Sequence, residues 1–178
     1  MDNEVTDAIV GEEPNRKALL IGLSSSIFLL LLAFGIGIFS HGWTATASVV
    51  ISGMVLEVVV AAVASIPLGF DPLSGALIAA ISNMILAPFL LASFDVIINK
   101  SAWLKRKLTR AEKIGDKYGK YGVWILAPLA PFIGVFVGIA VGAALRFRPL
   151  NILISLGLGV IIAAFLTTYG GDGIKSLF

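Results

Sequence analysis

The chain of 178 residues contains no cysteine and a single histidine, His41. Without thiols there are no disulfide bonds and no thiolate chemistry, and one histidine is too few for a multi-histidine metal site. Charged residues make up only 13% of the chain, whereas 58% are hydrophobic. Soluble domains carry about 25% charged residues. A chain with so little polar surface cannot enclose a core in water, so the composition predicts an integral membrane protein.

Apolar and polar segments alternate along the chain in a way that predicts one membrane domain. The first apolar run, residues 18–39, has no charge and would reach about 33 Å as a helix, enough to cross a hydrocarbon core of ~30 Å. We expect a polar tail at 1–17, a membrane domain at 18–169 and a short tail at 170–178. Within the membrane domain we expect a first half at 18–98, a basic segment at 99–120 and a second half at 122–169.

The basic segment at 99–120 has a net charge of +6, from eight basic and two acidic residues. Its apolar residues recur at helical spacing, which predicts an amphipathic helix on the membrane surface. The positive-inside rule places this segment in the cytoplasm, and the side of the N-terminus stays open. Candidate ligands for anionic lipid headgroups are Lys105, Arg106, Arg146 and Arg148. Nucleic acid is not expected, because membrane attachment already explains the charge.

Each half contains a proline-rich break inside apolar sequence. The first contains Pro67 and Gly69, and the second contains Pro128 and Pro131. Asp71 followed by proline predicts the start of a helix that runs toward residue 98. Paired interruptions in two halves are typical of a transporter site, because open backbone at membrane depth must line a cavity or be buried in protein. Ordinary loops between spanning helices are the alternative interpretation.

The glycines and prolines at these breaks follow a recognisable order. The motifs are Ile66-Pro67-Leu68-Gly69, Asn83 with Pro88, Lys117-Tyr118-Gly119-Lys120-Tyr121-Gly122, and Pro128 to Pro131 followed by Gly134 and Gly138. Over roughly residues 50–170 the chain resembles the small multidrug export proteins, which we take as distant relatives of the DedA (VTT-domain) membrane proteins. The resemblance implies an all-α fold, an inverted repeat with two facing re-entrant hairpins plus spanning helices. It also implies transport of small hydrophobic compounds or lipids.

The chain departs from the family pattern at several positions. Ala61 and Val63 stand where the family has a Glu-Leu-Arg run, and Ile133 and Val137 replace two threonines. The arginines that DedA proteins carry in their second hairpin have no counterpart between residues 123 and 145. A mechanism in which those arginines hold phosphate is therefore not expected here.

Glu57 is the leading candidate for a functional residue. It lies inside an apolar run with no basic neighbour in the sequence, and a charge at the bilayer centre costs ~2.5–3.5 kcal/mol even on the lenient scale. Asp71 is a candidate cation or proton site, or only a helix cap. Asn83 is a candidate for contact with a substrate, and the alternative is that its side chain holds two helices together. Gly134, with the two glycines at four-residue steps after it, allows close packing within the chain or in a homodimer.

Together with the resemblance, which implies the activity, these observations lead us to expect a small transporter or lipid scramblase in the plasma (inner) membrane of a prokaryote. It would work through facing hairpins around Pro67 to Asp71 and Pro128 to Gly134, with proton coupling through Glu57. A non-transporting membrane module that organises lipids or partner proteins is the alternative. We find no nucleophile with a base and no metal or phosphate motif, so we expect neither an enzyme nor a cofactor.

Overall fold

The computed structural model describes residues 16–100, 119–145 and 147–175, and within these ranges every regular element is a helix. Three helical stretches are long and apolar enough to cross a membrane: Arg16–His41, Pro72–Phe94 and Pro149–Gly171. The first is α2 (Arg16–His41), and the last lies in α10 (Pro149–Lys175). At ~1.5 Å per residue each exceeds a hydrocarbon core of ~30 Å. The expectation of an all-α, multi-pass membrane protein is confirmed.

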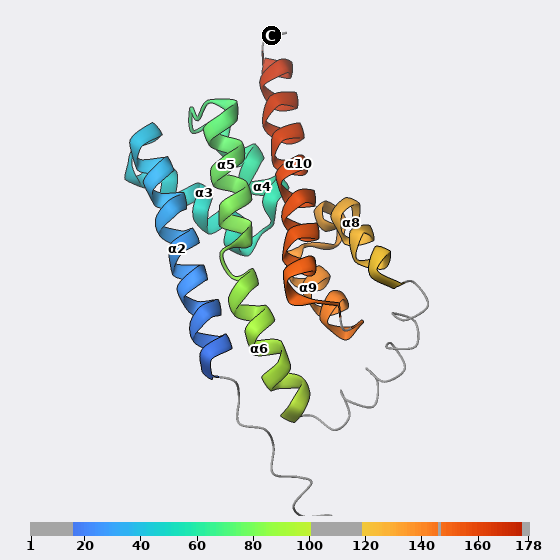
Figure 1. Cartoon of the computed structure of the whole chain (residues 1–178). Helices are drawn as coiled ribbons and strands as arrows, with labels where there is room; N and C mark the ends of the chain where they lie inside the picture. The colour runs from blue at the N-terminus through green and yellow to red at the C-terminus, as the bar shows by residue number, and fades with distance from the viewer. Residues whose placement is uncertain (1–15, 101–118, 146, 176–178) are drawn as a thin grey trace, which may run out of the picture.

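The middle stretch consists of α5 (Pro72–Met84) and α6 (Ala87–Lys100), separated by a two-residue turn. Pro88 has no N–H to donate to the carbonyl four residues before it, which explains the interruption. The turn is closed by a bond from the Ile85 N–H to the Ser82 carbonyl at 3.3 Å. In Figure 1, α5 and α6 run downward while α10 beside them runs upward, so the two long stretches are antiparallel.

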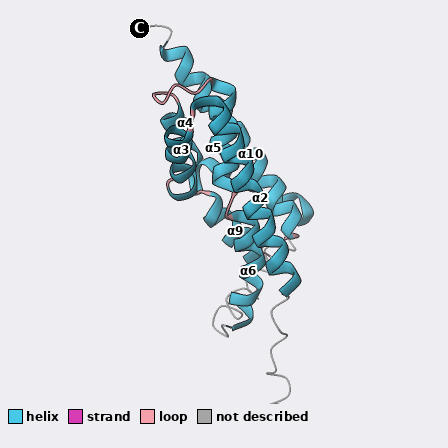
Figure 2. Ribbon diagram, turned by 90° about the vertical axis from the view of Figure 1, so that its left-hand side faces the viewer, coloured by secondary structure: helices cyan, strands magenta, loops and turns pink. Residues whose placement is uncertain are grey.

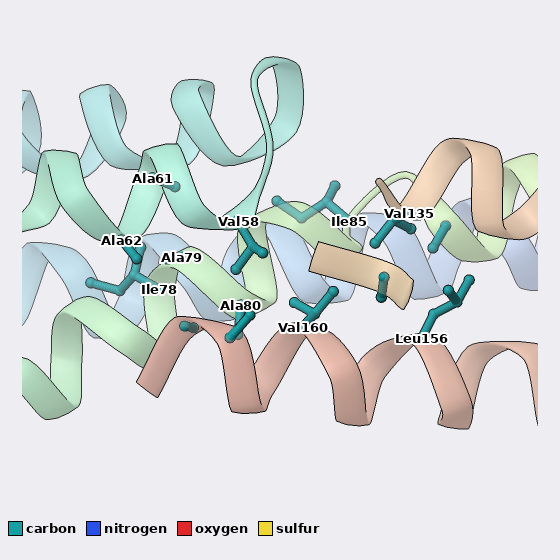
Figure 3. Packing of buried hydrophobic residues seen from close by; sticks show 14 of the residues in the cluster. Val58, Ala61, Ala62, Ile78, Ala79, Ala80, Ile85, Val135, Leu156 and Val160 are labelled. Atoms are coloured by element: carbon teal, nitrogen blue, oxygen red, sulfur yellow. The ribbon is translucent and has the colours of Figure 1, made fainter. Parts of the chain in front are cut away.

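The apolar run 44–65 forms two short helices, α3 (Trp43–Val55) and α4 (Val58–Ser65). The chain turns back at Leu56 and Glu57, and the helices lie side by side (Figure 3). We call α3 and α4 the first helix pair and Glu57 its tip. At ~1.5 Å per residue the helices reach only about 20 and 12 Å, so neither crosses a bilayer. No turn signal is present in the sequence at this point, because positions 56 and 57 hold neither glycine nor proline.

The second half begins with a 3₁₀ segment, η1 (Gly119–Ile125), followed by α8 (Leu126–Ile133) and α9 (Val135–Ala144). We call α8 and α9 the second helix pair and Gly134, between them, its tip. The expected break at Pro128 to Pro131 is wrong by a few residues, because both prolines lie within α8. Pro131 leaves the Ala127 carbonyl without its helical donor, and Gly159 of α10 packs directly against that carbonyl oxygen.

The core lies where the two helix pairs meet α5 and α10. Val58, Ile85, Val135 and Val160 are each at most 2% exposed, and Figure 3 shows them near one another in the packed cluster. Alanines at the helix contacts let the backbones approach closely, as in membrane bundles. Seen from the side in Figure 2, the bundle is a narrow slab of helices. Many large apolar side chains point outward, among them Phe39, Leu166 and Phe132, which suits a surface covered by lipid.

Candidate functional site

The tips of the two helix pairs meet inside the protein. Oε1 of Glu57 lies against Gly134, in the space that a side chain at position 134 would fill. The valines that follow, Val58 and Val135, are both buried, and in Figure 3 the turn of the first pair points toward Val135. Glu57 itself is half-buried. Among the residues that the structure describes, no donor is hydrogen-bonded to its carboxylate. A polar group with no such partner thus lies where four short helices meet.

Both tips have the same unusual backbone conformation. Glu57 has φ 120° and ψ 163°, and Gly134 has φ 78° and ψ 155°. This region is essentially restricted to glycine, and a residue with a Cβ costs of order 1–3 kcal/mol there. Glu57 is the one non-glycine residue with positive φ in the described ranges. The first tip therefore holds a strained glutamate where the second holds an unstrained glycine.

Asn83 stabilises the first tip from α5. Its side-chain amide donates to the Gly53 carbonyl at 2.9 Å, and the bond is buried. In a continuous helix this carbonyl would accept from the residue four positions later, which is Glu57, but α3 ends before it. A buried carbonyl without a donor is costly, so the asparagine offsets the cost of the turn. Helix attachment, one of the two roles expected for Asn83, is what this contact shows.

The close contacts of the first half recur in the second half at residue numbers 77 higher, the same step that leads from Glu57 to Gly134. A Cβ on Gly53 would meet Ser82 at 2.7 Å, and a Cβ on Gly159 would meet Ala130 at 2.9 Å. Likewise Gly75 packs on Ser65, and Gly142 packs on Ile152. The prolines that begin α5 and α10 have the same separation. The two halves therefore share one packing scheme.

The other residues of the first predicted break lie away from the tips. Pro67 and Gly69 are exposed in the connection between α4 and α5, where Gly69 approaches the ring of His41. That ring stacks on Phe70 with centroids 4.7 Å apart. The expectation that the turn around Pro67 to Asp71 faces the second break is therefore corrected: Glu57 faces Gly134. The physical reason is that the chain turns where α3 ends, well before the prolines.

Asp71 is the N-cap of α5, as its position before Pro72 predicts. Its carboxylate accepts from the Ser74 N–H at 3.0 Å and from the Ser74 hydroxyl. These hydrogen bonds, the hydroxyl first, lower the pKa of Asp71 below its ordinary value of 3.8. The residue is exposed at the end of the bundle. The local geometry is that of a helix cap.

The remaining candidates are basic. Arg148 is exposed, just before α10. Lys105, Arg106 and Arg146 lie outside the described residues. Within the described ranges no group of three or more His, Asp or Glu side chains could hold a metal ion.

Sequence reasoning missed three residues that shape the site. Gly53 and Ser82 let α3 and α5 touch, and Ser155 donates to the Val123 carbonyl at 2.8 Å. The signal was weak, since a lone glycine or serine in an apolar run has many explanations. The contacts became visible only when helices about 30 residues apart in sequence were placed side by side.

The fold and the tip contact define a class: multi-pass helical membrane proteins with two short helix pairs that meet between long helices. Residues 57–166 match the model of the family described as "Putative small multi-drug export protein". The match covers more than half of the chain and begins at Glu57, and the chain belongs to this family. No curated protein and no solved structure matches it.

Proposed function

We propose that this protein is a small membrane transporter or lipid scramblase whose site is the meeting point of the two tips. The observation that carries the proposal is the Glu57 carboxylate against Gly134, with no hydrogen-bond donor to it among the described residues. An ionisable side chain in the interior of a membrane protein is costly and most often marks the route of a substrate or proton. The family's description as export proteins agrees with this role.

The two helix pairs act in this proposal as re-entrant hairpins of an inverted repeat. Each is too short to cross the bilayer, so each would enter and leave on one side. The shared packing of the two halves and the antiparallel course of α5 and α10 in Figure 1 support the repeat. Sites of such transporters lie at the repeat interface near the midplane. The same arrangement is the basis for proposing a distant relationship to DedA proteins.

The charges suggest an orientation. If α2 and α5–α6 each cross once and the first pair returns, the start of α2 and the end of α6 lie on the same side; in Figure 1 both are at the lower end. Arg16, Lys17 and Lys100 are at these ends, and Arg148 precedes α10. The positive-inside rule makes this side cytoplasmic, together with the basic segment 99–120. We propose the plasma (inner) membrane of a prokaryote, with the basic residues attracting anionic lipids.

Transport would proceed by separation of the tips. The side chains buried around the tips, among them Val58, Ile85 and Val135, are apolar, so a space opened there would suit a hydrophobic compound or a lipid chain. The one carboxyl group would suit a headgroup or an exchanged proton. Glu57 would bind a proton when the substrate leaves and release it when the substrate returns. This coupling rests on Glu57 being the one acidic residue at the tips.

A homodimer remains part of the proposal, but its interface is not the one expected. Gly138 and Gly142 pack within the chain, against Leu156 and Ile152 of α10. A second copy would therefore contact another face, and the outer side of α2 is a candidate because α2 is the least buried of the three spanning stretches.

The experiment that tests the proposed function is transfer of fluorescent lipid across proteoliposome bilayers by the wild type, Glu57→Gln and empty vesicles. Asp71→Asn is the matched control, because it removes a carboxylate at the end of the bundle. We expect transfer well above empty vesicles, lost in Glu57→Gln and kept in Asp71→Asn. Absence of transfer in the wild type would contradict the lipid reading. If the wild type also failed to move a hydrophobic dye, the alternative, a membrane module that does not transport, would be the better interpretation.

A further inference from the structure

Each half has one side-chain hydrogen bond to a neighbouring helix, but the two bonds lie at different distances from the tips. In the first pair, Asn83 binds the Gly53 carbonyl, one helical turn before the tip at Glu57. In the second half, Ser155 binds the Val123 carbonyl, which lies in η1 before α8 begins. One side-chain hydrogen bond thus holds a tip, and the other holds a base. Both are buried, so neither is weakened by competing water.

The 77-residue correspondence shows that each half lacks the bond of the other. Val160 occupies the position that matches Asn83, and a valine side chain has no N–H or O–H group to donate. The carbonyl of Ala130, which matches Gly53, accepts from the N–H of Gly134 at 3.0 Å instead. Ile78 matches Ser155 and is equally unable to donate. The difference is therefore built into the sequence of the two halves.

Near its tip no side-chain hydrogen bond holds the second pair to α10 among the described residues. Gly159 of α10 packs on Ala127 and Ala130, and Gly138 packs on Leu156. Small smooth surfaces of this kind can slide or separate without breaking a hydrogen bond. The first tip, in contrast, cannot leave α5 without exposing the Gly53 carbonyl and the Asn83 amide.

We propose that Asn83 is a positioning residue, which fixes the tip that carries Glu57, and that the second helix pair is the part that moves. In this arrangement α8 and α9 swing away from Glu57 about the Ser155–Val123 bond. The strained backbone of Glu57 fits this assignment, since such a conformation persists only where its surroundings hold it firmly. The inference rests on the proposed function only in that the motion opens the transport site.

The test is a pair of distance distributions measured by double electron–electron resonance in lipid nanodiscs. The chain contains no cysteine, so spin labels can be placed on pairs of introduced cysteines without other changes. Phe39→Cys at the exposed end of α2 is the common reference. It is paired with Leu56→Cys at the first tip or with Phe132→Cys near the second; all three native side chains are more than half exposed.

We expect a single narrow distribution for the 39–56 pair and one about two-fold broader, or with two populations, for the 39–132 pair. Equal widths, or a broader 39–56 distribution, would overturn the assignment of the moving part. The measurement needs no transport, so a failure of lipid transfer leaves it intact. Conversely, distance distributions of equal width would not contradict the proposed function, which the lipid-transfer assay tests separately.

The role of Asn83 is tested in the same 39–56 pair. Asn83→Leu removes the amide at similar volume and should broaden the distribution to about the width seen for the second tip. Asn83→Gln, which retains a donor, should restore part of the narrow distribution. Ser82→Ala is the matched control, because its buried hydroxyl has no hydrogen-bond partner in the part of the chain that the structure describes. A narrow distribution in Asn83→Leu would overturn the positioning role.

Discussion

Glu57 and Gly134 occupy corresponding positions in the two halves, and the carboxylate of the first lies in the side-chain space of the second. One half therefore supplies a carboxylate, and the other supplies the room for it. A glutamate at both positions would place two carboxylates in one space, and a glycine at both would leave none. This complementarity is consistent with a site shared by the two halves.

Gly134→Ala tests that complementarity. The added methyl group would overlap Oε1 of Glu57, and the positive φ of 78° adds backbone strain, so we expect a loss of about 1–3 kcal/mol. Thermal unfolding in detergent measures the change. Gly35→Ala is the control, because a Cβ there meets nothing within 4 Å and alanine favours a helix by up to about 1 kcal/mol. Equal stability of the two variants would contradict the contact.

Glu57→Gly should separate function from stability. Glycine adopts the backbone conformation at position 57 without strain, so we expect unfolding free energy that is unchanged or up to about 2 kcal/mol higher. Lipid transfer should be lost, because the carboxylate is gone. Glu57→Gln keeps the strain and should also lose transfer without the gain in stability. A variant with glycine that is clearly less stable than the wild type would show that the side chain is mainly structural.

The shared packing scheme predicts matched effects in the two halves. Gly53→Ala places a methyl group of α3 against Ser82 of α5, and Gly159→Ala places one of α10 against Ala127 and Ala130 of α8. We expect each variant to lose about 1–3 kcal/mol of stability. Gly157→Ala is the comparison, since its new Cβ would meet only the end of Met84 at 3.8 Å. Thermal unfolding of the three variants gives the ranking. If Gly53→Ala lowered the stability and Gly159→Ala did not, the two halves would pack differently.

Asp71 should make stability depend on pH in the acid range. Its pKa is lowered in the folded protein, so its contribution is present above the unfolded value of about 3.8 and is lost as the pH falls through the folded pKa. Asp71→Asn keeps a capping oxygen and should lose less stability than the wild type on acidification. Asp71→Ala should cost about 1 kcal/mol at neutral pH by removing the cap. Parallel acid titrations of wild type and Asp71→Asn would contradict this.

Much of the architecture was predictable because it follows from composition and local chemistry. The excess of apolar residues requires a lipid environment, and the length of the apolar run 18–39 sets the first spanning helix. Asp71 with Pro72 marks the start of α5, because capping and the fixed φ of proline act within one helical turn. Glu57 stood out for its charge alone, since a lone acid in apolar sequence is costly wherever the chain places it.

Other features depended on contacts between distant segments, and the sequence by itself left them open. The turn at Glu57 has no glycine or proline, and its buried carbonyl is satisfied by Asn83, which lies 30 residues away. Only the tertiary structure shows that Glu57, and not the turn around Pro67, faces the second helix pair. The physical reason is that composition and local patterns fix which segments enter the membrane and where helices start. Packing between helices and the satisfaction of buried backbone groups decide where they turn and which residues meet.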